Sequence, residues 1–141
     1  MVKIMKYLLD TNVLSESVKT SPKKTVLAKI ERHQHEITTA SVVWHELLYG
    51  CYRLPKSKKR SFIEQFLEEV VYRNIPILPY DEHAAKWHAS IRARLIAKGL
   101  TPPFADGQIA SIANVNDLIL VTNNTADFIC FKELRLENWH E

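Results

Sequence analysis

The feature that most constrains the fold of this chain is the alternation of short apolar runs with longer segments of helical periodicity. Residues 4–9 form a nearly continuous apolar run, and residues 118–121 form a second one. Runs of this kind are typical of parallel strands that are covered on both faces. Because helical segments separate the runs, the sequence predicts an α/β fold with a mainly parallel sheet.

Capping residues, prolines and apolar spacing predict the other elements. We expect Ser21, Ser41, Ser57 (or Ser61) and Asp81 to cap helices, and Gly99 to end one of them. Pro76 indicates an edge strand, because proline cannot donate a hydrogen bond to a central ladder. The expected helices span 11–18, 22–32, 42–53, 58–73, 82–98 and 104–115, and the further strands span 36–39, 75–78 and 134–136.

Length and composition indicate an ordinary globular protein. A chain of 141 residues suits one domain that buries roughly two thirds of its unfolded surface. No apolar stretch approaches the ~18 residues of a membrane span, and lysines interrupt the N-terminal run, which makes it a poor signal peptide. Cys51 and Cys130 lack metal-site spacing and are interpreted as reduced thiols of a cytoplasmic protein, with a disulfide left open.

Four acidic residues occupy positions where a lone carboxylate is unfavourable. Asp10 follows the first apolar run, and Asp127 comes shortly after the second. Ligand sites of parallel sheets lie beyond the carboxyl ends of the strands, so we expect these two carboxylates at the same edge. Glu46 lies on a largely apolar helical face, and Asp106 lies near the start of a helix.

Each acid also has a structural interpretation. Asp10 and Asp106 can be helix caps, and Asp127 can form a turn. Glu46 can take part in a buried salt bridge to Arg or Lys, or the helix register can leave it at the margin of the apolar face. The structural interpretation is hardest to accept for Glu46, because burial of an unpaired carboxylate costs several kcal/mol. If the fold gathers all four, their mutual repulsion requires a divalent cation. Hard oxygen ligands favour Mg²⁺ or Mn²⁺, which predicts metal-dependent cleavage of a phosphodiester.

The positive charge is concentrated in the first half of the chain. The densest cluster comprises Arg53, Lys56, Lys58, Lys59 and Arg60. Such a cluster can attract a phosphate backbone, although it can equally be a solvated helix start. Tyr49 and Phe104 could stack on bases but are expected in the core, whereas Trp44, Trp87 and Trp139 are expected to be core or partner-facing residues. The histidines lack zinc-ligand spacing.

Four segments together resemble the PIN-domain nucleases, and within them the VapC-like toxins of toxin–antitoxin pairs. The segments are Leu8-Leu9-Asp10-Thr11-Asn12-Val13-Leu14-Ser15-Glu16, Val43-Trp44-His45-Glu46-Leu47-Leu48-Tyr49-Gly50, Pro103-Phe104-Ala105-Asp106-Gly107-Gln108-Ile109-Ala110 and Leu120-Val121-Thr122-Asn123-Asn124-Thr125-Ala126-Asp127-Phe128. The resemblance implies a single PIN-like domain over 1–141, with a five-stranded parallel sheet between helices. The chain departs from the family at Asn123, where relatives often carry a basic residue.

The same resemblance implies Asp10, Glu46, Asp106 and Asp127 as the acidic site, with Asn12, Thr122 and Asn124 as polar supports. It also implies an RNA substrate, a small antitoxin partner and a homodimer.

The resulting hypothesis is that a metal-activated water hydrolyses RNA. Asp10 and Asp106 would hold the main ion, and Glu46 and Asp127 would act through water or a second ion. A DNA nuclease, an aspartyl phosphohydrolase and an inactive partner-binding module remain alternatives. Asn12 argues against the phosphohydrolase, because such enzymes usually carry a second aspartate at that position.

Overall fold

The computed structural model describes residues 4–141. Residues 1–3, which begin the predicted 1–141 domain, lie outside the described residues. The strands are β1 (Tyr7–Leu9), β2 (Ile37–Ala40), β3 (Ile77–Leu78), β4 (Ile119–Val121) and β5 (Leu136–Glu137). The helices are α1 (Thr11–Leu14), the 3₁₀ helix η1 (Ser15–Val18), α2 (Lys24–Arg32), α3 (Ser41–Tyr52), α4 (Lys58–Phe66), the π-helix η2 (Leu67–Tyr72), α5 (Glu82–Ala97), α6 (Phe104–Val115) and α7 (Thr125–Phe128).

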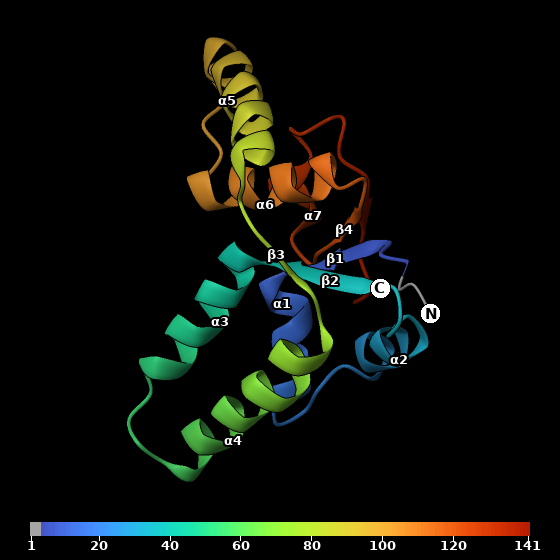
Figure 1. The fold of residues 1–141 in the computed structure, drawn as a ribbon, viewed down its shortest axis with the longest axis vertical. Helices are drawn as coiled ribbons and strands as arrows, with labels where there is room; N and C mark the ends of the chain where they lie inside the picture. The colour runs from blue at the N-terminus through green and yellow to red at the C-terminus, as the bar shows by residue number, and fades with distance from the viewer. Residues whose placement is uncertain (1–3) are drawn as a thin grey trace.

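The strands form one five-stranded sheet in the order β3-β2-β1-β4-β5. Every neighbouring pair is parallel, with Tyr7 opposite Ile37 on one side and Ile119 on the other. Helices α5, α6 and α7 lie on one side of the sheet, and α1, α2, α3 and α4 lie on the other (Figure 1). The predicted α/β fold with a five-stranded parallel sheet flanked by helices is therefore confirmed, and β3 is an edge strand as Pro76 indicated.

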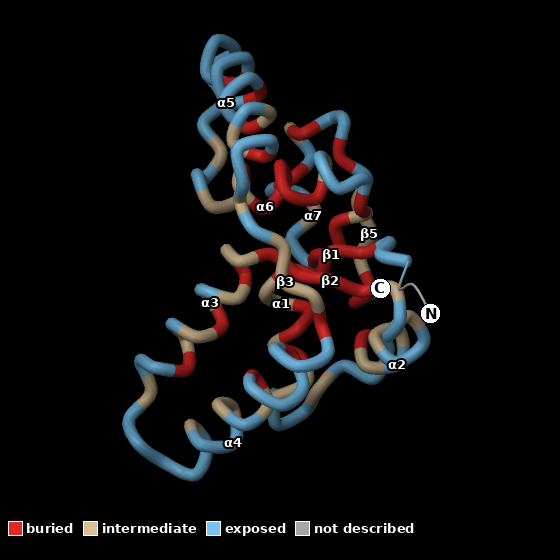
Figure 2. The backbone as a smooth tube through the Cα atoms, in the orientation of Figure 1, coloured by how far each residue is buried: buried red, intermediate tan, exposed pale blue. Residues whose placement is uncertain are grey.

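The core follows the central strands, as the apolar runs predicted. Leu8, Leu9, Leu120 and Val121 are fully buried, and burial in Figure 2 is concentrated around this part of the sheet. The polar strand β2 is buried as well, because its threonine hydroxyls find partners on β1. Thr38 Oγ1 donates to the Tyr7 carbonyl at 3.0 Å, and the Thr39 hydroxyl donates to the Leu9 carbonyl at 2.8 Å. Paired hydroxyls avoid the cost of buried, unsatisfied polar groups.

Several helix ends agree with the predicted caps. Ser57 Oγ accepts a hydrogen bond from the Arg60 amide at 3.1 Å at the start of α4, so Ser57 rather than Ser61 is the cap. The Asp81 carboxylate accepts from the Ala84 amide at 2.9 Å at the start of α5. Gly99 follows that helix with a φ of 79°, a left-handed conformation that glycine adopts without strain.

Other predicted ends are wrong because tertiary contacts decide them. The first strand begins at Tyr7 rather than at residue 4, and Ile4 and Met5 are exposed. The neighbouring strand β2 begins only at Ile37, so the residues before Tyr7 extend beyond it. Ser21 does not cap α2, because the helix begins only after Lys23. The backbone amide of Lys23 donates a hydrogen bond to the Glu16 carboxylate at 2.7 Å.

The remaining differences are local. Ser41 is already helical, and Ala40 occupies the N-cap position of α3 because β2 runs directly into that helix. The predicted helix over 58–73 changes to π geometry at Leu67. Helix α7 was not predicted, and the last strand begins at Leu136 rather than at residue 134.

Within residues 4–141, no helix is long and apolar enough to cross a membrane. Cys51 and Cys130 are both free, so the disulfide that the sequence left open is not formed between them.

Candidate active site

Asp10 is held at the carboxyl end of β1 by several hydrogen-bond donors. Its carboxylate accepts from the Thr11 amide and from the Thr122 hydroxyl, each at 2.8 Å, and from the Asn12 side-chain amide at 3.4 Å. The parallel pairing of β1 with β4 brings Thr122 to this position. Burial raises the pKa of Asp10, Glu46 adds to the rise, and the donors oppose it.

The same network fixes the loop between β4 and α7. Asn12 Oδ1 accepts from the Asn123 amide at 2.8 Å, and the Thr122 hydroxyl accepts from the Asn124 amide at 3.1 Å. Asn12 and Thr122 therefore connect Asp10 on one strand with the loop that follows the neighbouring strand. Two of the three predicted polar supports contact the Asp10 carboxylate directly, and the third, Asn124, bonds to one of them through its backbone.

Glu46 lies in α3, where the buried residues Val43 and Leu47 pack the same helix against the core. Its side chain is half-buried and accepts a hydrogen bond from Thr11 Oγ1 at 2.5 Å. No Lys or Arg among the described residues forms a salt bridge with it, so the buried ion pair considered from sequence is wrong. The role of Thr11 as the partner of Glu46 was missed, because only tertiary structure brings residues this far apart in sequence together.

Asp106 lies in the first turn of α6 but does not cap it. The N-cap position belongs to Pro103 and has no side-chain hydrogen bond, so the capping interpretation is wrong. Among the described residues, the Asp106 carboxylate has no hydrogen-bond partner. Burial, followed by the negative charges of Asp10, Asp127 and Glu46, raises the pKa of Asp106 to about 6.

Asp127 lies in the first turn of the short helix α7, and its side chain is exposed. Its backbone amide donates to the Asn124 carbonyl at 3.0 Å, so the segment does make a tight turn, as the structural interpretation expected. The Asp127 carboxylate has no hydrogen-bond partner within the described part of the chain, and it faces the same space as Asp106.

One pocket collects all four acids. Its volume is about 340 Å³, and Thr122 lies directly behind Asp10. Asp10 at the end of β1, Asp106 and Asp127 in the first turns of α6 and α7, and Glu46 within α3 thus deliver one carboxylate each to a single space. None of the described residues that line it is Lys, Arg or His. The lining residues are Asp10, Thr11, Asn12, Ser15, Glu46, Asp106, Ile109, Asn124, Asp127 and Phe128.

The donor set of this pocket fits a hard divalent cation. Carboxylate, amide and hydroxyl oxygens are the ligands that Mg²⁺ and Mn²⁺ favour. Across residues 4–141, no three Asp, Glu, His or Cys side chains converge closely enough to hold an ion together.

The structure does not bring the predicted basic cluster to the acids. Lys56, Lys58 and Lys59 are exposed where α3 connects to α4, at the end of the helix pair that projects from the sheet (Figure 1). Arg60 is already occupied, since it pairs with Glu64 at 2.8 Å and donates to the Leu54 carbonyl at 3.1 Å. None of these residues lines the acidic pocket.

A close contact behind Asp106 was also missed. His88 is buried in α5, and its Nδ1 lies 2.8 Å from the hydroxyl of Tyr80. A Cβ atom at Gly107 would clash with His88 Nε2, so any larger residue at this position of α6 requires His88 to move. Burial, with Arg92 nearby, lowers the pKa of His88, which favours the neutral ring. A glycine inside a predicted helix was the available signal.

Comparison with known families agrees with this geometry. The family model for the PIN domain matches residues 7–134. The chain belongs to the PIN-domain family. The match covers strands β1 to β4 and every residue of the acidic pocket, and it ends just before β5.

Within the PIN-domain family, the chain resembles toxins. It is 33% identical over 137 residues to the tRNA(fMet)-specific endonuclease VapC of Shigella flexneri, covering 96% of this chain and 99% of the relative. It is 30% identical over 137 residues to the toxin FitB of Neisseria gonorrhoeae, covering 95% and 99%. Among solved structures, FitAB bound to an IR36 DNA fragment superimposes with a TM-score of 0.88 at 27% identity, covering 96% of each chain.

This PIN-domain protein is therefore an endoribonuclease of the VapC type, a hydrolase of phosphodiester bonds that belongs to a toxin–antitoxin system.

Proposed function

We propose that this PIN-domain protein hydrolyses RNA with Asp10, Glu46, Asp106 and Asp127 as its catalytic acids and Mg²⁺ or Mn²⁺ as its cofactor. The observation that carries the proposal is the single pocket that all four carboxylates line, without a basic side chain among the described lining residues. Carboxylates gathered in this way repel one another, and a divalent cation relieves that repulsion.

The four acids have different surroundings, which suggests different roles. Asp10 is oriented by its donors, so it is suited to hold the main ion, together with Asp106, which lines the same pocket. Glu46 and Asp127 act through water or a second ion and orient the attacking water. When bound, the cation supplies Lewis-acid chemistry that activates water and offsets charge on the scissile phosphate. Thr122, Asn12 and Asn124 keep the Asp10 side of the pocket in place.

The substrate we propose is a structured RNA cleaved within an unpaired loop. Sequence-specific proteins usually read RNA in loops and bulges, where the bases are accessible. A transfer RNA is the substrate class to test first, because the relative from Shigella flexneri is named as a tRNA(fMet)-specific endonuclease. Arg53, Lys56, Lys58 and Lys59 would contact the backbone that flanks the scissile bond, and Arg60 would support them.

We further propose that a small antitoxin protein neutralises this nuclease, that the nuclease is a homodimer, and that it acts in the cytoplasm. Its similarity to the toxin FitB and to the solved FitAB assembly supports the antitoxin. The two free cysteines are compatible with a reducing compartment.

The test is cleavage of total cellular RNA by the purified protein in Mg²⁺, in EDTA, and after Asp10→Asn substitution. Asp117→Asn is the matched control, because Asp117 is exposed and lies outside the pocket. We expect discrete fragments that require both the metal and Asp10, and no cleavage of a DNA strand of the same sequence. Cleavage that persists in EDTA and in Asp10→Asn would refute the four-acid mechanism, and preferential cleavage of DNA would refute the substrate.

A further inference from the structure

Three planar side chains form a row along the exposed face of α3. His45, Tyr49 and Arg53 are spaced four residues apart, so they lie above one another on the helix. The rings of His45 and Tyr49 are nearly parallel, with an interplanar angle of 23° and centroids 6.2 Å apart. The Arg53 guanidinium lies over the Tyr49 ring, 5.0 Å from its centroid.

This row is exposed although its central member is aromatic. Tyr49 is 57% exposed, in contrast to the expectation from sequence that it belongs to the core. The opposite face of α3 supplies the core instead, through Val43, Leu47 and Cys51. The ring therefore contributes little to the core, and its aromatic and cation–π contacts among the described residues are with the other two members of the row.

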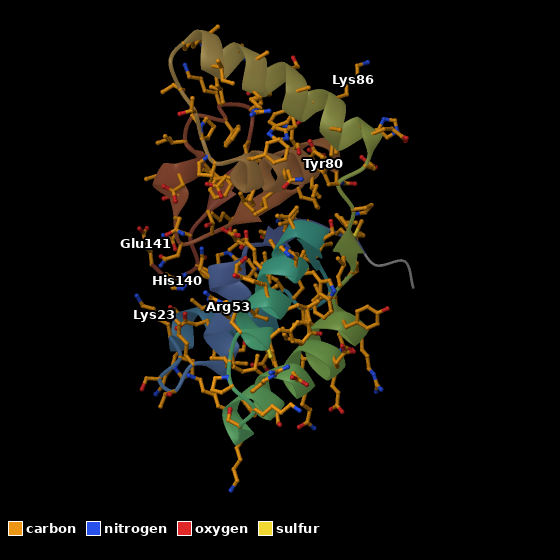
Figure 3. The ribbon with its side chains drawn as sticks, turned by 90° about the vertical axis from the view of Figure 1, so that its left-hand side faces the viewer. Lys23, Arg53, Tyr80, Lys86, His140 and Glu141 are labelled. Carbon is orange, nitrogen blue, oxygen red and sulfur yellow. The ribbon has the colours of Figure 1, made fainter. Side chains whose placement is uncertain are left out.

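The row begins beside the acidic pocket. Glu46, which lines that pocket, directly follows His45 and lies one helical turn before Tyr49. From Glu46 to Arg53 the helix rises about 10 Å, at 1.5 Å per residue. Arg53 is the C-cap of α3 and leads into the connection that carries Lys56, Lys58 and Lys59. Figure 3 faces α3 and labels Arg53 on this side of the molecule. A carboxylate, stacked planar groups and positive charge thus follow one another along α3 and the connection after it.

We propose that His45, Tyr49 and Arg53 form a stacking platform for unpaired nucleotides of the RNA substrate next to the scissile bond. Bases stack on aromatic rings and on guanidinium planes, and Arg53 with the adjacent lysines adds attraction for the backbone. The carboxylates repel phosphate until a cation is bound, so a neighbouring surface that binds bases and backbone can hold the strand in register. This platform rests on the proposed function, since it assumes that the acidic pocket is where RNA is cut.

Binding can be tested separately from cleavage in the Asp10→Asn background. The measurement is the affinity, in Mg²⁺, of a short unpaired RNA oligonucleotide that carries a fluorescent base analogue. Tyr49→Ala removes the ring, and Tyr49→Phe keeps it without the hydroxyl. Phe62→Ala is the matched control, because Phe62 is also 57% exposed but lies on α4 outside the row. Circular dichroism verifies that each variant is folded.

We expect Tyr49→Ala to weaken RNA binding about 5- to 100-fold and to abolish stacking-induced quenching of the analogue. Tyr49→Phe and Phe62→Ala should bind within about twofold of the parent, because stacking needs the ring and not the hydroxyl. Equal affinities of Tyr49→Ala and Phe62→Ala would overturn the platform and leave the row as a surface for a protein partner. Absence of RNA binding by the Asp10→Asn parent would overturn it too.

Failure of the proposed function would give a different pattern of results from failure of the platform. If cleavage does not need Asp10 but Tyr49→Ala still weakens binding with loss of quenching, the row is an RNA-binding surface, its place next to the scissile bond is overturned, and the four-acid mechanism fails.

Discussion

The two walls of the acidic pocket are built in different ways. On one wall, Asp10 is almost fully buried and accepts hydrogen bonds from Thr11, Thr122 and Asn12. On the other wall, the carboxylates of Asp106 and Asp127 have no hydrogen-bond partner among the described residues. The first wall is thus set by side-chain donors, whereas the second is set only by the placement of α6 and α7.

This difference shows which part of the site is already in place before a ligand binds. A carboxylate that already has its donors needs little reorganisation when a ligand binds, and such preorganisation is a main source of electrostatic catalysis. On the wall without donors, burial and then the neighbouring negative charges keep the pKa of Asp106 high. The pocket therefore combines a fixed anchor with an electrostatically strained half that a cation stabilises.

The largest expected effect is the loss of RNA cleavage when either wall loses a carboxylate. Asp10→Asn and Asp106→Asn should each lower the rate of RNA cleavage by more than about 100-fold, because loss of even a supporting residue behind a metal ligand typically costs 10–100-fold. Initial cleavage rates in saturating Mg²⁺ measure this, with Asp117→Asn as control. If only Asp10→Asn lost activity, Asp106 would not be a metal ligand, and only the wall that carries Asp10 would belong to the metal site.

The next effect concerns the donors of the fixed wall. Thr122→Val removes the hydroxyl that donates to Asp10 at 2.8 Å and should weaken Mg²⁺ affinity about 10- to 100-fold. Thr38→Val is the matched control, because Thr38 is equally buried but its hydroxyl donates to the Tyr7 carbonyl. Titration of cleavage with Mg²⁺ separates the two variants. If Thr122→Val and Thr38→Val required the same Mg²⁺ concentration, the hydrogen bond from Thr122 to Asp10 would not contribute to Mg²⁺ binding.

A third prediction concerns the backbone support of the second wall. Gly107→Ala places a Cβ against His88, which Tyr80 holds in place, so it should lower the free energy of unfolding by about 1–3 kcal/mol. Gly50→Ala is the control, because a Cβ there meets nothing within 4 Å and alanine favours the helix by up to ~1 kcal/mol. Urea unfolding measures both. If the two variants were equally stable, α5 and α6 would be able to move apart enough to accept the added Cβ.

The smallest expected effect is the pH dependence of the protein without metal. The pKa of Asp106 is about 6 in the folded protein against an ordinary value of 3.8, so the folded state binds more protons between these values. The contribution of Asp106 to the free energy of unfolding is therefore full at acidic pH and falls as pH rises through 6. Asp106→Asn should raise the stability at pH 7 by about 1 kcal/mol, because solvent screens this half-buried group.

Thermal unfolding in EDTA across this pH range tests the sign. Added Mg²⁺ should restore stability above pH 6 in the parent by mass action. A parent protein that became more stable as pH rose through 6 would contradict the electrostatic strain assigned to the second wall.

Local patterns predicted much of the fold. The apolar run at Leu118–Val121, the caps Ser57 and Asp81, and the bounds of α6 agree with the structure because each depends on nearby residues. The start of α2 was not predictable, since a hydrogen bond from Lys23 to Glu16 decides it. Tyr49 and Phe104 were expected in the core, yet they are 57% and 50% exposed because their helices bury other faces.

The sequence by itself determined the parallel α/β class, the four acids and their order along the chain. Apolar runs and polar strand ends are local signals, and parallel strands place their carboxyl ends at one edge. Only the tertiary structure decided which acid is anchored and which is strained. Asp10 receives a donor from Thr122, which is 112 positions away, and Asp106 receives none. Hydrogen-bond partners and burial depend on residues that meet only after the strands have paired and the helices have packed.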